Sequence, residues 1–187
     1  MTDHPGLVPT DQTTTLEIAD GDRILTFSYR QALDFHKGNA YWGCALAFRM
    51  LQRAGGLLSR DGLWDRNRLQ VTSGHPGPGV RDTLELVTGC VSGGRFRLDC
   101  ERHEARCVGD MKYAWTLSDG DSEVSIALVG GLVPDAFLQL LDKIDRHPAT
   151  TEDQSRLEAF KQQMTERIWH MSLEQSFPDS GIRVRSL

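Results

Sequence analysis

The sequence predicts an α+β fold, because helical and strand-like periodicities occur in separate parts of the chain. Apolar side chains recur at helical spacing across residues 29–54 and again across residues 134–171. Between them, large apolar residues occupy every second position at Met111, Tyr113, Trp115 and Leu117. Asp119-Gly120 then supplies a turn, and the alternation resumes at Val124, Ile126 and Leu128. Helices on both sides of a run of strands are typical of an α+β domain.

The N-terminal part is expected to form an arm, a hairpin and a short helix. Residues 1–14 are polar and contain two prolines, so we expect a loose arm there. Apolar residues on both sides of Asp20-Gly21 predict a hairpin. Ser28 and Gln31 have the spacing of a capping box, which predicts a helix from Tyr29 to His36.

A second helix is expected from about Asn39 to Ala54. Its first half is rich in small residues, which let another backbone approach closely: Gly38, Ala40, Gly43, Cys44, Ala45 and Ala47. Gly55-Gly56 is expected to end this helix.

The centre of the chain predicts a strand, a loop and a third helix. Leu69–Thr72 is strand-like, and the loop over residues 73–79 contains two prolines that exclude a helix or a central strand. Apolar residues at helical spacing predict a helix from Val80 to Thr88, and Gly89 is its expected stop. Residues 95–117 are expected to form strands.

The C-terminal part predicts two more helices. Pro134 opens the first and Pro148 ends it. Thr151 and Gln154 are expected to cap the last helix, whose apolar stripe is Leu157, Phe160, Met164, Ile168 and Met171. We therefore expect a flexible arm over residues 1–14, an α+β domain over residues 15–150, and a C-terminal helix and tail over residues 151–187.

Composition and charge argue against some classes of protein, namely nucleic-acid-binding and membrane proteins. A chain of 187 residues with 39% hydrophobic residues is long enough to bury the core of one domain. A net charge of −5 argues against nucleic-acid binding through bulk charge. We find neither an apolar run long enough to cross a membrane nor an N-terminal export signal, so we expect a cytoplasmic protein that does not act at a membrane.

The four cysteines, Cys44, Cys90, Cys100 and Cys107, are expected to be thiols that are either buried or bound to a metal. They form no CxxC pair, which excludes the common structural zinc finger. His103 lies between Cys100 and Cys107, but this spacing is not a standard zinc motif. Because charged residues surround these three positions, we expect a polar hairpin tip that binds no metal.

Three other positions are candidates for a shared metal site. His36 ends a short helix, His75 lies in the loop before Val80, and Cys90 directly follows the helix that begins there. Packing is the alternative, since an isolated histidine or buried cysteine usually belongs to the core or the surface. Cys44 could join His36 only if Gly38 breaks the helix, because eight residues of one helix would separate the two by about 12 Å.

The loop before Val80 also has the arrangement that presents backbone N–H groups to an anion. Gly77, Gly79 and Val80 keep their N–H groups, although two prolines remove two other donors. The glycine spacing is GxxGxG and matches no nucleotide-binding motif. The alternative is a rigid loop that only turns the chain.

Two motifs resemble the FmdE-like family, which takes its name from one of the subunits of formylmethanofuran dehydrogenase. Phe35-His36-Lys37-Gly38, followed by Gly43 and a helix of small residues, is similar to the Phe-His-Gly-His start of that family. The helix over residues 80–88, followed by Gly89 and Cys90, looks like its second motif, an Asp-bearing helix that ends in Thr-Gly-Cys. The resemblance covers roughly residues 28–145.

The chain also departs from that family. Gly38 stands where the family has a second histidine, and Ala40 stands where it has a cysteine. A further family cysteine corresponds to Gly79 or its surroundings, and His75 is its suggested substitute. No cysteine follows Cys107, so the C-terminal zinc module of many members is absent.

The resemblance implies helices packed on a small mixed sheet, related to the substrate domain of glyceraldehyde-phosphate dehydrogenase. It also implies a homodimer and a metal site built from His36 and Cys90, with His75 as the third ligand and Cys44 as a further candidate. Two imidazoles and a thiolate suit one divalent transition metal, zinc first, with nickel, cobalt or iron as alternatives. The pterin cofactor of the dehydrogenase is held by its other subunits and is not expected here.

Three functions stay open at this point. The first is a metal-binding protein that could be an enzyme, with Asp82 and Lys112 as candidate acid–base residues and a small anion as a candidate ligand. The second is a non-catalytic accessory or metal carrier for a partner enzyme. The third is a metal-free structural domain, which an apolar neighbourhood around Cys90 would favour.

The last helix provides a separate reason to expect a homodimer. Its apolar stripe, flanked by Trp169 and His170, is wider than one packing partner usually covers, and soluble monomers avoid such patches. The alternative is that this helix folds back over its own domain.

Overall fold

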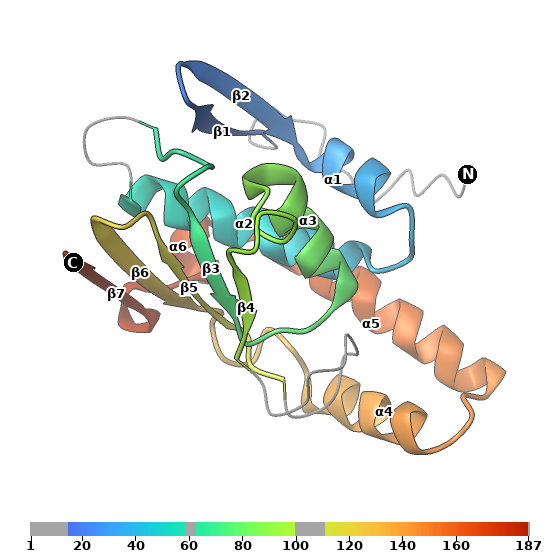
Figure 1. The fold of residues 1–187 in the computed structure, drawn as a ribbon. Coiled ribbons are helices and arrows are strands. Elements are labelled where there is room, and N and C mark those ends of the chain that lie inside the picture. Colours follow the sequence, from blue (N-terminus) through green and yellow to red (C-terminus); the bar gives the residue numbers. More distant parts are fainter. Residues whose placement is uncertain (1–14, 59–62, 100–110, 187) are drawn as a thin grey trace.

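The computed structural model describes residues 15–58, 63–99 and 111–186. A mixed five-stranded sheet carries helices on one face, and a separate two-stranded hairpin packs against the first two helices (Figure 1). In spatial order the strands of the sheet are β4 (Phe96–Leu98), β3 (Gln70–Ser73), β5 (Ala114–Ser118), β6 (Ser122–Ala127) and β7 (Ile182–Ser186). The predicted α+β class is therefore confirmed, and β3 makes the sheet mixed because it pairs parallel with β4 and antiparallel with β5.

The N-terminal hairpin consists of β1 (Thr15–Asp20) and β2 (Arg23–Ser28), as the sequence predicts. Gly21 adopts φ = 60° in its turn, a conformation that favours glycine. The hairpin is held to the rest of the chain by the Ala19 N–H, which donates to the Trp64 carbonyl at 2.9 Å.

Helix α1 (Tyr29–His36) begins where the capping box predicts. The Ser28 side chain accepts from the Gln31 N–H, and the Gln31 side chain accepts from the Ser28 N–H. The helix ends at Lys37, which adopts φ = 54°. This left-handed residue turns the chain sharply from α1 toward the next helix.

Helix α2 (Tyr41–Leu58) is the central helix, and it is longer than expected. The prediction that Gly55-Gly56 ends it is wrong, because the helix continues through both glycines. Gly55 is buried against the indole of Trp64, and a Cβ at position 55 would lie 3.1 Å from that ring. Tertiary packing therefore overrides the low helix propensity of glycine here.

Helix α3 (Pro78–Thr88) agrees with the predicted third helix. It begins two residues before the expected start, with Pro78 in its first turn, where the missing N–H costs nothing. Gly89 ends it in the left-handed conformation, with φ = 60°.

Helices α4 (Asp135–Arg146) and α5 (Thr151–His170) follow the sheet, and α5 starts with a different cap from the one expected. Thr150 and Asp153 form the capping box in place of Thr151 and Gln154. Asp153 also accepts from Lys143 Nζ of α4 at 2.7 Å, which ties the two helices together. A carboxylate at the third helical position serves the cap and the ion pair at once.

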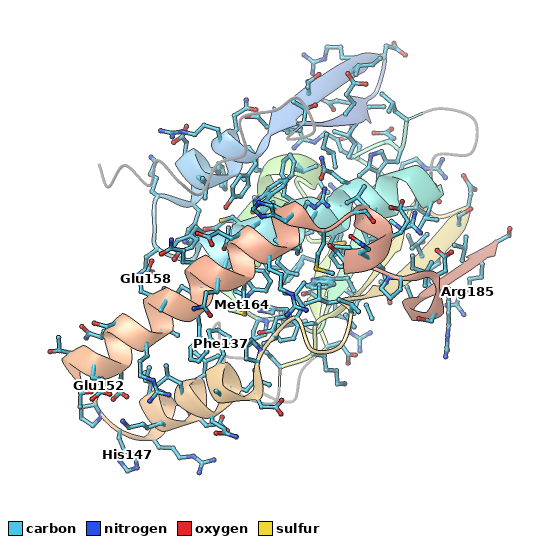
Figure 2. The ribbon with its side chains drawn as sticks, turned by 180° about the vertical axis from the view of Figure 1, so that it is seen from behind. Phe137, His147, Glu152, Glu158, Met164 and Arg185 are labelled. Carbon is cyan, nitrogen blue, oxygen red and sulfur yellow. The ribbon has the colours of Figure 1, made fainter. Side chains whose placement is uncertain are left out.

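The apolar stripe of α5 is buried inside the same chain. Met164 and Ile168 are 2% and 0% exposed, and Phe160 packs edge-on against Phe137 of α4 with ring centroids 6.0 Å apart. Figure 2 shows α4 and α5 side by side, with Phe137 and Met164 labelled. The stripe is therefore part of the core, and the argument that a partner chain must cover it is wrong. The homodimer itself stays a prediction.

The C-terminal segment completes the sheet. Helix α6 (Leu173–Ser176) and a short 3₁₀ turn (Asp179–Gly181) lead into β7, which pairs antiparallel with β6. Residues 151–186 therefore share one core and one sheet with the segment expected to form the domain at 15–150. No helix among the described residues is both long and apolar enough to span a membrane.

Candidate functional site

The two motifs of the resemblance meet where α1 ends and where α2 and α3 begin. At this junction the backbones of α2 and α3 are in direct contact. A Cβ at Gly79 would lie 2.2 Å from the Ala40 carbonyl oxygen, and a Cβ at Gly43 would lie 3.1 Å from the Val80 nitrogen. The expectation that small residues allow a close backbone approach is confirmed at Gly43.

His36 and Asp82 form a hydrogen-bonded pair at this junction. His36 Nδ1 lies 2.7 Å from Asp82 Oδ2, although 46 residues separate them in the sequence. The second ring nitrogen, Nε2, accepts from the Ala40 N–H at 3.2 Å. Because Nε2 accepts a hydrogen bond, the proton of the neutral ring is on Nδ1, where it is donated to Asp82. Both nitrogens of His36 therefore have partners.

The segment after His36 folds over the imidazole. A Cβ at Gly38 would lie 2.6 Å from His36 Nε2, so a side chain at position 38 would press on the ring. The His36 side chain is only 8% exposed, whereas Asp82 is 36% exposed. The Asp82 carboxylate is therefore the part of this pair that solvent can reach.

Helix α5 holds the same segment in place from the other side. Lys161 Nζ donates to the Asn39 carbonyl at 3.1 Å, and Tyr41 Oη donates to Glu158 Oε1 at 2.5 Å. Burial and the Glu158 hydrogen bond raise the pKa of Tyr41, so its hydroxyl stays protonated. Sequence reasoning missed these contacts, because more than 100 residues separate the partners and no local pattern links them.

His75 is buried away from solvent, and its ring makes aromatic contacts and a hydrogen bond within the protein. It is 2% exposed, with its ring edge-on to Tyr113 at 5.0 Å and stacked on Trp115 at 6.5 Å. Its Nδ1 accepts from the Gly77 N–H at 3.0 Å. Burial lowers the pKa of His75 to about 4, so the ring is neutral at ordinary pH.

Cys90 and Cys44 are both buried thiols with no disulfide partner. Burial raises the pKa of both, in the case of Cys44 to about 12. The Cys90 N–H donates to Thr88 Oγ1 at 3.2 Å, and this hydrogen bond lies in the turn that follows α3. Metals bind the thiolate, so a metal at either residue would have to displace the thiol proton.

The structure does not assemble the expected metal centre. Among the residues it describes, no three His, Cys, Asp or Glu side chains are grouped so that they could hold one ion. His36 pairs with Asp82, while His75 and Cys90 each have separate surroundings. The predicted non-ligands Cys100, His103 and Cys107 lie outside the described residues.

The expected anion site at Gly77, Gly79 and Val80 lies against other parts of the protein. The Gly77 N–H donates to His75, and the α2 backbone covers the first turn of α3 at Gly79 and Val80. One of the three expected donors, the Gly77 N–H, is therefore used within the loop, and anion binding there stays a prediction.

The two candidate acid–base residues lie in different surroundings. Asp82 belongs to the helix junction with His36. Lys112 is 65% exposed and its Nζ lies 3.9 Å from Asp99 Oδ2, beside a hollow on the open face of the sheet. The structure therefore does not join Lys112 and Asp82 in one site.

Comparisons with known proteins add no family assignment. No protein-family model matches the chain, and no curated protein matches it significantly.

Proposed function

We propose that this chain is a metal-free structural domain of the FmdE-like kind, which serves a partner protein as a non-catalytic accessory. One observation carries the proposal: each of the four candidate ligands already has a role in packing or hydrogen bonding. These residues are His36, Cys44, His75 and Cys90.

The state of His36 supports this proposal most directly. A metal takes a nitrogen lone pair, and on His36 only Nε2 carries one when Nδ1–H donates to Asp82. That lone pair accepts the Ala40 N–H, just before α2 begins. Metal binding would cost this hydrogen bond and would require the segment around Gly38 to move.

The neighbourhood of Cys90 supports the same conclusion. The residue is fully buried, belongs to the hydrophobic core, and has a thiol pKa that burial raises. An apolar neighbourhood is the one expected when this cysteine packs and does not bind a metal.

Metal binding at His36 is the second candidate function, and one observation favours it. Histidines that bind metals usually donate the other ring N–H to a carboxylate, as His36 does to Asp82. On this alternative His36 Nε2 would be the ligand to zinc, nickel, cobalt or iron. His75 and Cys90 would remain core residues in either case.

Titration calorimetry with zinc distinguishes the two candidates. The untagged protein is compared with His36→Gln and with His147→Gln, a matched control at an exposed histidine beyond the end of α4 (Figure 2). The proposal predicts no saturable binding that depends on His36. Binding that is lost in His36→Gln and kept in His147→Gln would overturn it and support the second candidate. Loss only in His147→Gln identifies a surface ion and supports the proposal.

A further inference from the structure

The face of the sheet turned away from the helices carries an ordered row of polar side chains. Strand register places five residues in line across β4, β3, β5, β6 and β7: Arg97, Thr72, Thr116, Ser125 and Arg183. Neighbouring residues on each strand point to the opposite face, where Val71, Leu117 and Val124 are buried. The row is therefore on the open side of the sheet, the side that faces the viewer in Figure 1.

The centre of this row is flat because its side chains are short. Thr116 and Ser125 hydrogen-bond to each other through their hydroxyls at 3.2 Å. The next row consists of Gly74, Ala114, Ala127 and Gly181. With the three middle residues of the first row, and with Asp99 and Lys112 at the edge, it lines a hollow of about 140 Å³. A solvated sheet face is ordinary in itself, but here the short side chains leave the middle of the row hollowed between the two arginines.

Each end of the row is an arginine. The Arg97 and Arg183 side chains are exposed, and neither guanidinium group makes a hydrogen bond or ion pair with a residue that the structure describes. Nearby charges on this face have partners, Arg185 with Glu123 at 2.8 Å and Lys112 with Asp99 at 3.9 Å. Within the described part of the chain, the row thus has an unbalanced positive charge at each end, although the net charge is −5.

We propose that this row is a docking surface for an extended acidic segment of a partner protein. The inference rests on the proposed accessory function, since it identifies the surface through which such a domain would act. Each arginine would bind a carboxylate through paired N–H groups, which is the geometry that guanidinium groups favour.

The dimensions of the row define the spacing of the acidic residues. Four strand-to-strand steps of about 4.8 Å place the arginines on strands about 19 Å apart. An extended peptide covers about 20 Å in six residues at about 3.3 Å per residue. Residues six apart also point to the same side of an extended chain, so two carboxylates at this spacing can face both arginines. A small apolar residue between them, on the same side, would face the hollow.

Fluorescence anisotropy with labelled peptides tests this surface. The main probe carries two aspartates six positions apart, with a valine between them on the same side. The matched probes replace both aspartates by asparagine or place them three positions apart. At low ionic strength the full chain should bind the main probe at least several-fold more tightly than either matched probe.

The protein variants locate the binding. Arg97→Ala with Arg183→Ala should weaken binding by about tenfold, the sum expected for two exposed charge pairs. Arg30→Ala with Arg156→Ala removes the same charge from α1 and α5 and should leave binding unchanged. Circular dichroism checks that both double variants are folded.

Three results would overturn the inference. They are equal affinity for all three peptides, equal loss in the two double variants, or tight binding of a single-stranded oligonucleotide in place of the acidic peptide. Zinc binding at His36 is measured separately, so failure of the docking surface and failure of the proposed function are distinguishable.

Discussion

At the scale of single residues, Gly79 shows how one missing side chain permits the helix junction. Both Gly79 and Gly56 lie in helices, so alanine has the higher helix propensity at either position. A Cβ at position 79 would meet the Ala40 carbonyl oxygen at 2.2 Å, whereas a Cβ at position 56 would meet no atom within 4 Å.

These surroundings predict opposite effects of the same substitution. Gly79→Ala should lower the free energy of unfolding by about 3 kcal/mol, because the backbones of α2 and α3 must separate. Gly56→Ala should raise it by about 1 kcal/mol. Urea denaturation measures both, and a neutral or stabilising Gly79→Ala would show that the helices are not in contact there.

His75 predicts a pH dependence of stability. Burial holds its pKa at about 4, below the usual 6.5, so between these values the unfolded chain takes up a proton that the folded chain excludes. The free energy of unfolding should therefore fall by about 3 kcal/mol as the pH drops from 6.5 to 4.

The variant His75→Asn isolates this contribution. Its side-chain oxygen can still accept from the Gly77 N–H, as in an Asx-turn, but it does not titrate. Denaturation across this pH range should give a smaller slope for the variant than for the wild-type chain. Parallel slopes would mean that His75 is not buried in the neutral form.

At the scale of elements, α5 belongs to the core and not to a separate appendage. Met164 is 2% exposed, so Met164→Ala should lower the free energy of unfolding by about 3 kcal/mol. The neighbouring Gln163 is exposed, and Gln163→Ala should change it by less than about 0.5 kcal/mol. Thermal denaturation compares the two, and equal melting temperatures would place the stripe outside the core.

Elements with a local signal could be predicted from the sequence. The Ser28 capping box begins α1, Gly89 ends α3, and the alternation around Asp119-Gly120 gives the β5–β6 hairpin. Each of these signals acts within a few residues, so the local sequence alone determines where the helix or hairpin begins or ends.

Elements that depend on distant partners could not be predicted in this way. The passage of α2 through Gly55 depends on the packing of Trp64, and β7 becomes a strand only beside β6. The cap of α5 uses Thr150 and Asp153, one residue before the expected pair, and Asp153 also binds Lys143 of α4. In the first two cases a tertiary contact decides between local alternatives.

At the scale of the whole molecule, the fold brings the two motifs together but not the expected ligands. His36 and Asp82 were each identified in the sequence, yet their pairing at 2.7 Å needs the contact between α1 and α3. His75 and Cys90 have the chemistry of metal ligands, but burial gives both a neutral, packed state. Burial is a property of the whole fold, so residue type alone could not show that these two side chains are packed in the core.

Elemental analysis of untagged protein tests the proposal that the chain acts without a resident transition metal. The protein is purified without chelators or metal-affinity resin, and inductively coupled plasma mass spectrometry measures zinc, nickel, cobalt and iron per chain. Because Nε2 of His36 accepts the Ala40 N–H and both described thiols are buried, we expect far less than one equivalent of any of them. One equivalent of a single metal in the wild-type protein, absent from His36→Gln, would contradict the account.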